Sequence, residues 1–269
     1  MMTRILLAVA AALVVLIILS PGKHPVSEPI QPVADSTLFE DSNTPEQAST
    51  RRAPRVAPLP GALEQAPSGT PFLDMQARLA IRRRIEREGA AVYLDSMLAT
   101  TDSTLVRWPD RGGAPLRVAF VGDTTLADWK DGLLDIARSG MRAWASNQAN
   151  ISLVEVDTSE TADIEVTFVT FVSGENELGV TNLEWNSAGE ARRAAIQVGL
   201  RADSASGLLP DGELRRVAVH EFGHALGLPH STIRDDIMHP SSRASAPSRR
   251  DHATLRLLYA VPPGSLRVD

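Results

Sequence analysis

The stretch from Leu214 to Pro240, LRRVAVHEFGHALGLPHSTIRDDIMHP, carries the pattern that decides the fold of this 269-residue chain. Its first part has helical periodicity: at about 100° per residue, one set of apolar side chains falls within about 120° of arc. That set is Ala218, Val219, Phe222, Ala225 and Leu226. Asp211 is expected to cap the start of this helix, and Gly227 is expected to end it.

Two histidines lie on another arc of the same helix. His220 and His224 are four residues apart, so their imidazoles point toward one place, as a pair of zinc ligands does. Glu221 follows the first histidine and is placed to accept a proton from a zinc-bound water. Gly227 lets the chain reverse, so that His230 returns as a third ligand. Three neutral nitrogens leave a fourth tetrahedral position for water, which is typical of a catalytic zinc site.

These residues carry a family resemblance. His220 to His230 fits H-E-x-x-H-x-x-G-x-x-H, and Asp236 to Pro240 resembles the methionine turn that follows it in metzincin zinc peptidases. Ser231 directly after the third histidine, and Met238-x-Pro240, make the chain most similar to the matrixins. The resemblance covers about residues 114–260.

The resemblance implies both a fold and an activity. The expected fold is α+β: a twisted five-stranded sheet with an antiparallel edge strand at 179–185 lies over the zinc helix, and a further helix follows near the C-terminus. The implied activity is that of a zinc-dependent metalloendopeptidase. Zinc would be held by His220, His224 and His230, with Glu221 as the general base. A protein or peptide substrate is the expected partner, and the chain is expected to be a monomer.

The segment before the zinc helix is mostly of β pattern. Apolar runs and alternation predict strands at 116–121, 151–156, 164–170, 179–185 and 195–200. Between the first two, an apolar stripe from Leu133 to Trp144 predicts a covering helix, with Asp123 or Thr124 as its cap. Ser248 and Asp251 predict a capping box at the start of the last helix. The catalytic domain is placed at 114–269.

Three further segments precede this domain. An apolar run at 5–19 makes residues 1–20 either a cleaved export signal or a short membrane anchor. Residues 21–71 are rich in Pro, Ser, Thr and Glu and are predicted to be a disordered linker. Residues 72–113 have helical periodicity around Ile81 and Ile85, and form either a pro-segment or a brace. The protein is therefore expected in the periplasm, the cell envelope or the extracellular space.

Composition excludes several classes of function. A net charge of −6, without a basic cluster interleaved with aromatics, argues against nucleic acid as a partner. The chain has no cysteine, which excludes disulfides, thiolate zinc ligands and the thiol latency switch of many matrixins. No histidine lies between Pro25 and Val219, so the second, structural zinc site of that family cannot be built from histidine.

Calcium is a second candidate cofactor, with acidic candidate ligands at Asp157, Glu160, Asp163, Glu175 and Glu177. The alternative function is a non-catalytic zinc-binding or adhesion module on the same fold, against which the intact Glu221 argues. An intramembrane protease is excluded by charged side chains beside the motif, at Glu213, Arg215 and Arg216. His239 and His252 are expected at the surface.

Overall fold

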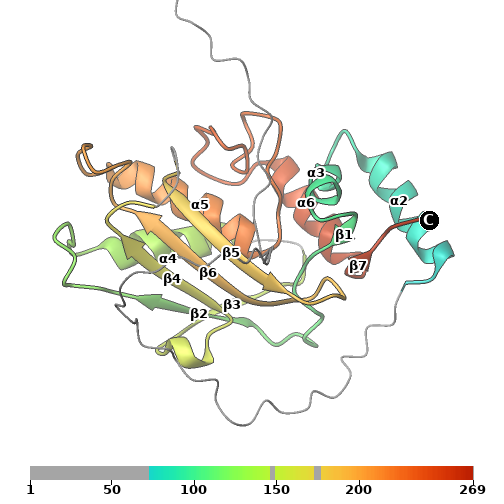
Figure 1. The fold of residues 1–269 in the computed structure, drawn as a ribbon, viewed down its shortest axis with the longest axis horizontal. Coiled ribbons are helices and arrows are strands. Elements are labelled where there is room, and N and C mark those ends of the chain that lie inside the picture. Colours follow the sequence, from blue (N-terminus) through green and yellow to red (C-terminus); the bar gives the residue numbers. More distant parts are fainter. Residues whose placement is uncertain (1–72, 146–148, 173–176, 269) are drawn as a thin grey trace, which may run out of the picture. The chain divides into compact units, whose positions relative to one another are not determined.

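The computed structural model describes residues 73–145, 149–172 and 177–268, shown in Figure 1. The predicted export signal or anchor at 1–20 and the predicted linker at 21–71 lie outside these residues. Within the described ranges, no helix combines the length and the apolar composition that crossing a membrane requires.

A five-stranded sheet forms the centre of the fold (Figure 1). Its strands are β2 (Leu116–Val121), β3 (Leu153–Val156), β4 (Ile164–Val169), β5 (Gly179–Trp185) and β6 (Ala191–Gly199). They run in the order β3-β2-β4-β6-β5, with parallel pairing up to β6 and β5 antiparallel on β6. The predicted α+β fold with an antiparallel edge strand is confirmed.

Two helices pack against each other and against the sheet: α4 (Leu133–Ala145) and α5 (Asp211–Ala225). The helix α4 starts later than predicted, so Asp123 or Thr124 as its cap is wrong. The Asp123 carboxylate instead accepts the Thr125 backbone N–H at 2.9 Å, which makes a local turn. Gly132 then adopts φ of +89°, a left-handed conformation that cannot belong to the helix.

The predicted zinc helix is α5. It ends as expected, because Gly227 adopts φ of +94°. The prediction that Asp211 caps its start is wrong: Pro210 is the capping position and Asp211 is the first helical residue. The Asp211 carboxylate contacts the Lys130 ammonium instead, so it does not bind the first turn of the helix.

The last helix is α6 (Arg249–Tyr259), and its predicted capping box is present: Ser248 accepts the Asp251 N–H, and Asp251 accepts the Ser248 N–H. The short helix η1 (Ser159–Thr161) connects β3 to β4. The strand β6 begins earlier than predicted, because its pairing with β5 continues back to Arg193 and then, past a bulge at Glu184 and Trp185, to Ala191.

Residues 73–108, here called the N-terminal arm, contain α2 (Met75–Glu88), α3 (Leu94–Thr100) and β1 (Thr104–Leu105). The strand β1 pairs with β7 (Gly264–Ser265) near the C-terminus. The arm shares an apolar cluster with α6 and the residues after it. The members of this cluster are Ile81, Ile85, Val92, Leu94, Met97, Leu105, Val106, Leu257, Leu258, Val261 and Leu266. A second, larger cluster lies among the sheet, α4 and α5.

Candidate metal centre

Three histidine side chains converge beside α5. The Nε2 atom of His220 lies 3.1 Å from Nε2 of His224 and 3.3 Å from Nε2 of His230. In the described part of the chain, this is the one group of three or more His, Cys, Asp or Glu residues whose ligand atoms could share a metal ion. The structure therefore brings together the three histidines that the spacing singled out.

Backbone carbonyls orient two of the rings. His220 Nδ1 lies 2.7 Å from the Ile237 carbonyl oxygen, and His224 Nδ1 lies 2.8 Å from that of Leu228. A carbonyl oxygen only accepts, so both Nδ1 atoms carry the proton, and both Nε2 lone pairs face the centre of the group. Lone pairs held this close repel one another unless a cation lies between them. Three imidazole nitrogens are a donor set that fits zinc, which is commonly bound by such nitrogens in tetrahedral sites.

Burial keeps the three rings neutral. It lowers the pKa of His220, and it lowers the pKa of His224 well below the usual value, with the two neighbouring imidazoles adding to the effect. Burial and the neighbouring His220 lower the pKa of His230 to about 3. Neutral imidazole is the form that binds a metal, so the free site is already in its ligand state at neutral pH.

Glu221 lies beside the histidines without belonging to the converging group. Its side chain is buried, and its Oε2 accepts the Thr181 hydroxyl at 2.7 Å. Burial raises the pKa of Glu221 to about 7, the Thr181 hydrogen bond opposes this rise, and the charge of Glu177 adds to it. A carboxyl group with a pKa near neutrality is suited to taking up and releasing a proton at physiological pH.

The edge strand β5 lies directly against Glu221. A Cβ atom at Gly179 would come within 2.6 Å of Val217 Cγ1 and within 2.8 Å of Glu221 Oε1, so only glycine fits there. Thr181 is two residues further on and thus shares the face of β5 that meets α5. The sequence prediction did not single out either residue. Their two-residue spacing on a predicted edge strand is the signal that could have identified them.

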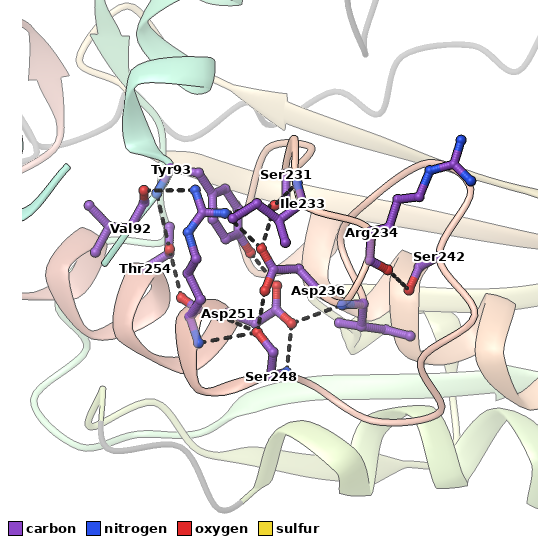
Figure 2. A network of polar contacts seen from close by, with 12 residues as sticks. Val92, Tyr93, Ser231, Ile233, Arg234, Asp236, Ser242, Ser248, Asp251 and Thr254 are labelled. Carbon is purple, nitrogen blue, oxygen red and sulfur yellow. Dashed lines mark hydrogen bonds and ion pairs between the residues drawn. The ribbon is translucent and has the colours of Figure 1, made fainter. Parts of the chain in front are cut away.

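The methionine turn lies next to two of the three histidines. Met238 is fully buried, and its carbonyl accepts the Ser231 N–H at 2.9 Å, directly after His230. Asp236 accepts the Ser248 hydroxyl at 2.6 Å and an Arg250 N–H at 2.8 Å, and the Ser231 hydroxyl also donates to it. Figure 2 shows Ser231, Asp236 and Ser248 close together at the start of α6.

Two other histidines differ in position. His239 is partly buried, and its Nδ1 accepts the Ser241 N–H at 3.0 Å. His252 is also partly buried, and its ring packs edge-on against the fully buried Trp144 with ring centres 5.8 Å apart. The predicted surface position is therefore only partly correct for both histidines.

The candidate calcium ligands gain no support from the described residues. Asp163 is engaged by two guanidinium groups, Arg111 at 3.0 Å and Arg117 at 3.2 Å. Glu175 lies outside the described residues. The remaining acidic candidates do not converge with three or more ligand atoms.

The family model of the matrixins, a peptidase family, matches residues 123–260 of the chain. The chain belongs to the matrixin family. The match contains the three histidines, Glu221 and the methionine turn, whereas β2 and the N-terminal arm precede it. This matrixin also resembles the hatching enzyme of Paracentrotus lividus, with 46% identity over 56 residues. The shared stretch is 19% of this chain, and the chain spans about a tenth of that relative's length.

Proposed function

We propose that this matrixin is a zinc-dependent metalloendopeptidase that hydrolyses peptide bonds outside the cytoplasm. His220, His224 and His230 hold the zinc ion, and Glu221 is the general base. The observation that carries the proposal is the convergence of three Nε2 atoms, with that of His220 at 3.1 and 3.3 Å from those of His224 and His230, beside a buried carboxylate that is not part of the converging group.

The zinc ion, when bound, supplies a Lewis acid that polarises the scissile carbonyl and makes a water molecule more acidic. Glu221 accepts the proton of the attacking water and passes it to the leaving amine as the peptide bond breaks. Thr181 holds Oε2 of this carboxylate, which leaves Oε1 as the oxygen for proton transfer.

The edge strand β5 supports a peptide as the substrate. It pairs with β6 along one side, and no other strand of the described ranges pairs with its second side. An extended peptide can therefore add to this edge through main-chain hydrogen bonds, which is a common mode of peptide recognition. Because Gly179 and Thr181 on β5 contact Glu221, a peptide on this edge lies next to the base.

The location outside the cytoplasm rests on the sequence. The apolar run at 5–19 follows Arg4 at the N-terminus, as in an export signal or a short anchor. Either form would place the catalytic residues beyond the cytoplasmic membrane.

The test is cleavage of a random peptide library by the full chain loaded with zinc. A chelator should abolish cleavage and added zinc should restore it. Glu221→Gln should keep the zinc content while turnover falls by roughly 10² to 10⁴-fold, the loss typical of a missing general base. Glu213→Gln is the matched control on the same helix, where the carboxylate only pairs with Arg216, and it should leave turnover unchanged.

Two outcomes would contradict the proposal. Equal turnover by the parent and Glu221→Gln would show that this carboxylate is not the base. A zinc-loaded parent that cleaves no peptide would favour the alternative, a non-catalytic zinc-binding or adhesion module on the same fold.

A further inference from the structure

Asp251 is a fully buried carboxylate that joins the N-terminal arm to the methionine turn (Figure 2). Its Oδ1 accepts the Tyr93 hydroxyl at 2.6 Å. Its Oδ2 accepts the backbone N–H of Ile237 at 2.9 Å and that of Ser248 at 2.6 Å. A single side chain on α6 thus contacts the arm, the methionine turn and the start of its own helix.

The backbone of one residue in the turn, Ile237, links Asp251 to a predicted metal ligand. The Ile237 N–H donates to Asp251, while the Ile237 carbonyl accepts from His220 Nδ1 at 2.7 Å. Three hydrogen bonds, linked through the Asp251 carboxylate and the Ile237 backbone, therefore connect the Tyr93 hydroxyl to the ring of His220. Groups that hold the second nitrogen of a ligand histidine fix the direction of its metal-binding nitrogen.

Arg250 makes a second connection, toward His230. Its guanidinium donates to the Val92 carbonyl at 3.0 Å, to the Ser231 hydroxyl at 3.0 Å and to Asp236 at 2.8 Å. It also lies 5.0 Å from the centre of the Tyr93 ring, in position for a cation–π contact. Ser231 is the residue after His230, so the arm is linked to the segment of the third ligand as well.

The end of the zinc helix is the third point of contact. The indole N–H of Trp108 donates to the Ala225 carbonyl at 2.7 Å, near the C-terminal end of α5. Val106 is close to the reversal that leads to His230, because a Cβ atom on Gly227 would come within 2.8 Å of its carbonyl oxygen. The arm therefore contacts both the helix with two of the ligands and the loop that brings the third.

These contacts are buried, and their burial opposes release of the arm from the rest of the chain. Tyr93 is 1% exposed and Trp108 is 2% exposed. Burial and the neighbouring Asp251 raise the pKa of Tyr93, so its hydroxyl keeps the proton that it donates. Loss of the arm would uncover an apolar cluster and take one of the hydrogen-bond partners from a buried carboxylate, and both changes disfavour the rest of the fold.

We propose that the N-terminal arm is a permanent brace of the metal centre, and that Tyr93 is a positioning residue that acts on His220 through Asp251 and Ile237. The proposal rests on the proposed function, because the site that it concerns is the zinc site. It decides between the two predictions for this segment, a pro-segment or a brace, since a pro-segment would have to leave for the enzyme to work.

The test compares two substitutions in the full chain. Tyr93→Phe removes only the hydroxyl and keeps the ring in its apolar surroundings. Removal of groups that orient metal ligands weakens metal binding by roughly 10 to 100-fold, and Tyr93 lies further from the metal, so we expect a weakening of about tenfold. The zinc dissociation constant is measured by competition with a chelator at fixed pH, and the melting temperature of the same samples is recorded.

Ile85→Ala is the matched control. Ile85 is a buried residue of the same arm that belongs to the apolar cluster and takes no part in the three linked hydrogen bonds. Its truncation should lower the melting temperature at least as much as Tyr93→Phe, while the zinc dissociation constant stays at the parent value. If Tyr93→Phe does not fold, Arg250→Lys replaces it, because lysine keeps the charge but lacks the fork that spans Val92, Ser231 and Asp236.

The outcomes separate this inference from the proposed function. Unchanged zinc affinity in Tyr93→Phe, or an equal loss of affinity in Ile85→Ala, would overturn the positioning role while a peptide-cleaving parent still supports the peptidase. A parent chain that binds no zinc would overturn the proposed function, and this inference with it.

Discussion

The part of the chain that matches the matrixin family and the N-terminal arm before it differ in what they contribute to one site. Residues 123–260 supply the three histidines, Glu221 and the methionine turn. The arm at 73–108 supplies none of these, yet its side chains contact the α5 helix and α6, and Asp251 of α6 in turn binds the methionine turn. The comparison shows that a family match can mark where the chemistry lies without marking where the folded unit begins.

The sheet supports the same conclusion. The strand β2 precedes the family match, but it lies inside the sheet between β3 and β4 and pairs with both. A sheet without it would leave β3 unpaired and expose the backbone of β4. The predicted boundaries of the catalytic domain, 114–269, include β2 and leave out the arm, and they stay a prediction.

The largest expected effect comes from replacing a histidine in the part of the chain that matches the matrixin family. His224→Ala should lose both zinc and peptidase activity, because the two remaining histidines make a poor tetrahedral site. The folded structure should persist, since the arm and the two apolar clusters are untouched. Metal analysis, peptide cleavage and circular dichroism check the three statements. A variant that keeps one tightly bound zinc ion would show that the metal lies elsewhere.

The convergence of the three histidines was predictable from sequence for a physical reason. Histidines four apart on a helix share a face whatever surrounds that helix, and Gly227 marks the point where the chain must reverse. The antiparallel edge strand and the capping box at Ser248 were likewise correct, because each depends on residues close together in the chain.

The supporting contacts were not predictable in this way. Thr181 meets Glu221 across 40 positions of sequence, and Tyr93 meets Asp251 across 158. Such pairs depend on how the sheet and helices are placed, which local periodicity does not specify. The wrong caps have a related cause: Asp123 and Asp211 are good capping residues by type, but a local turn and Lys130 engage them.

A smaller effect is expected when Thr181, whose hydroxyl donates to the Glu221 carboxylate, is replaced. Thr181→Val should lower kcat by about tenfold, because a hydrogen bond to a charged group contributes roughly 1.5–3 kcal/mol and here fixes the orientation of the base. KM and zinc content should change little. Thr181→Ser, which keeps the hydroxyl, should retain most of the activity. Steady-state kinetics of both variants decide the matter, and a Thr181→Val enzyme with the parent kcat would remove Thr181 from the mechanism.

The smallest effect is expected when the chain is cut between the two regions of the molecule. Gly112 and Gly113 are exposed and both adopt positive φ, in a turn between the arm and β2. A specific protease site inserted there leaves the β1–β7 pairing, the Tyr93–Asp251 hydrogen bond and the shared apolar cluster intact. The two pieces should therefore stay together in size-exclusion chromatography, with zinc and turnover at the values of the uncut chain. Exposed loop tips accept such cuts when the pieces on either side are held by their own contacts.

A pro-segment behaves in the opposite way: the cut would release the arm, and peptide cleavage would rise as it left. Release of the arm with rising activity would thus refute the brace, while co-elution at constant activity would exclude removal of the arm as the route of activation.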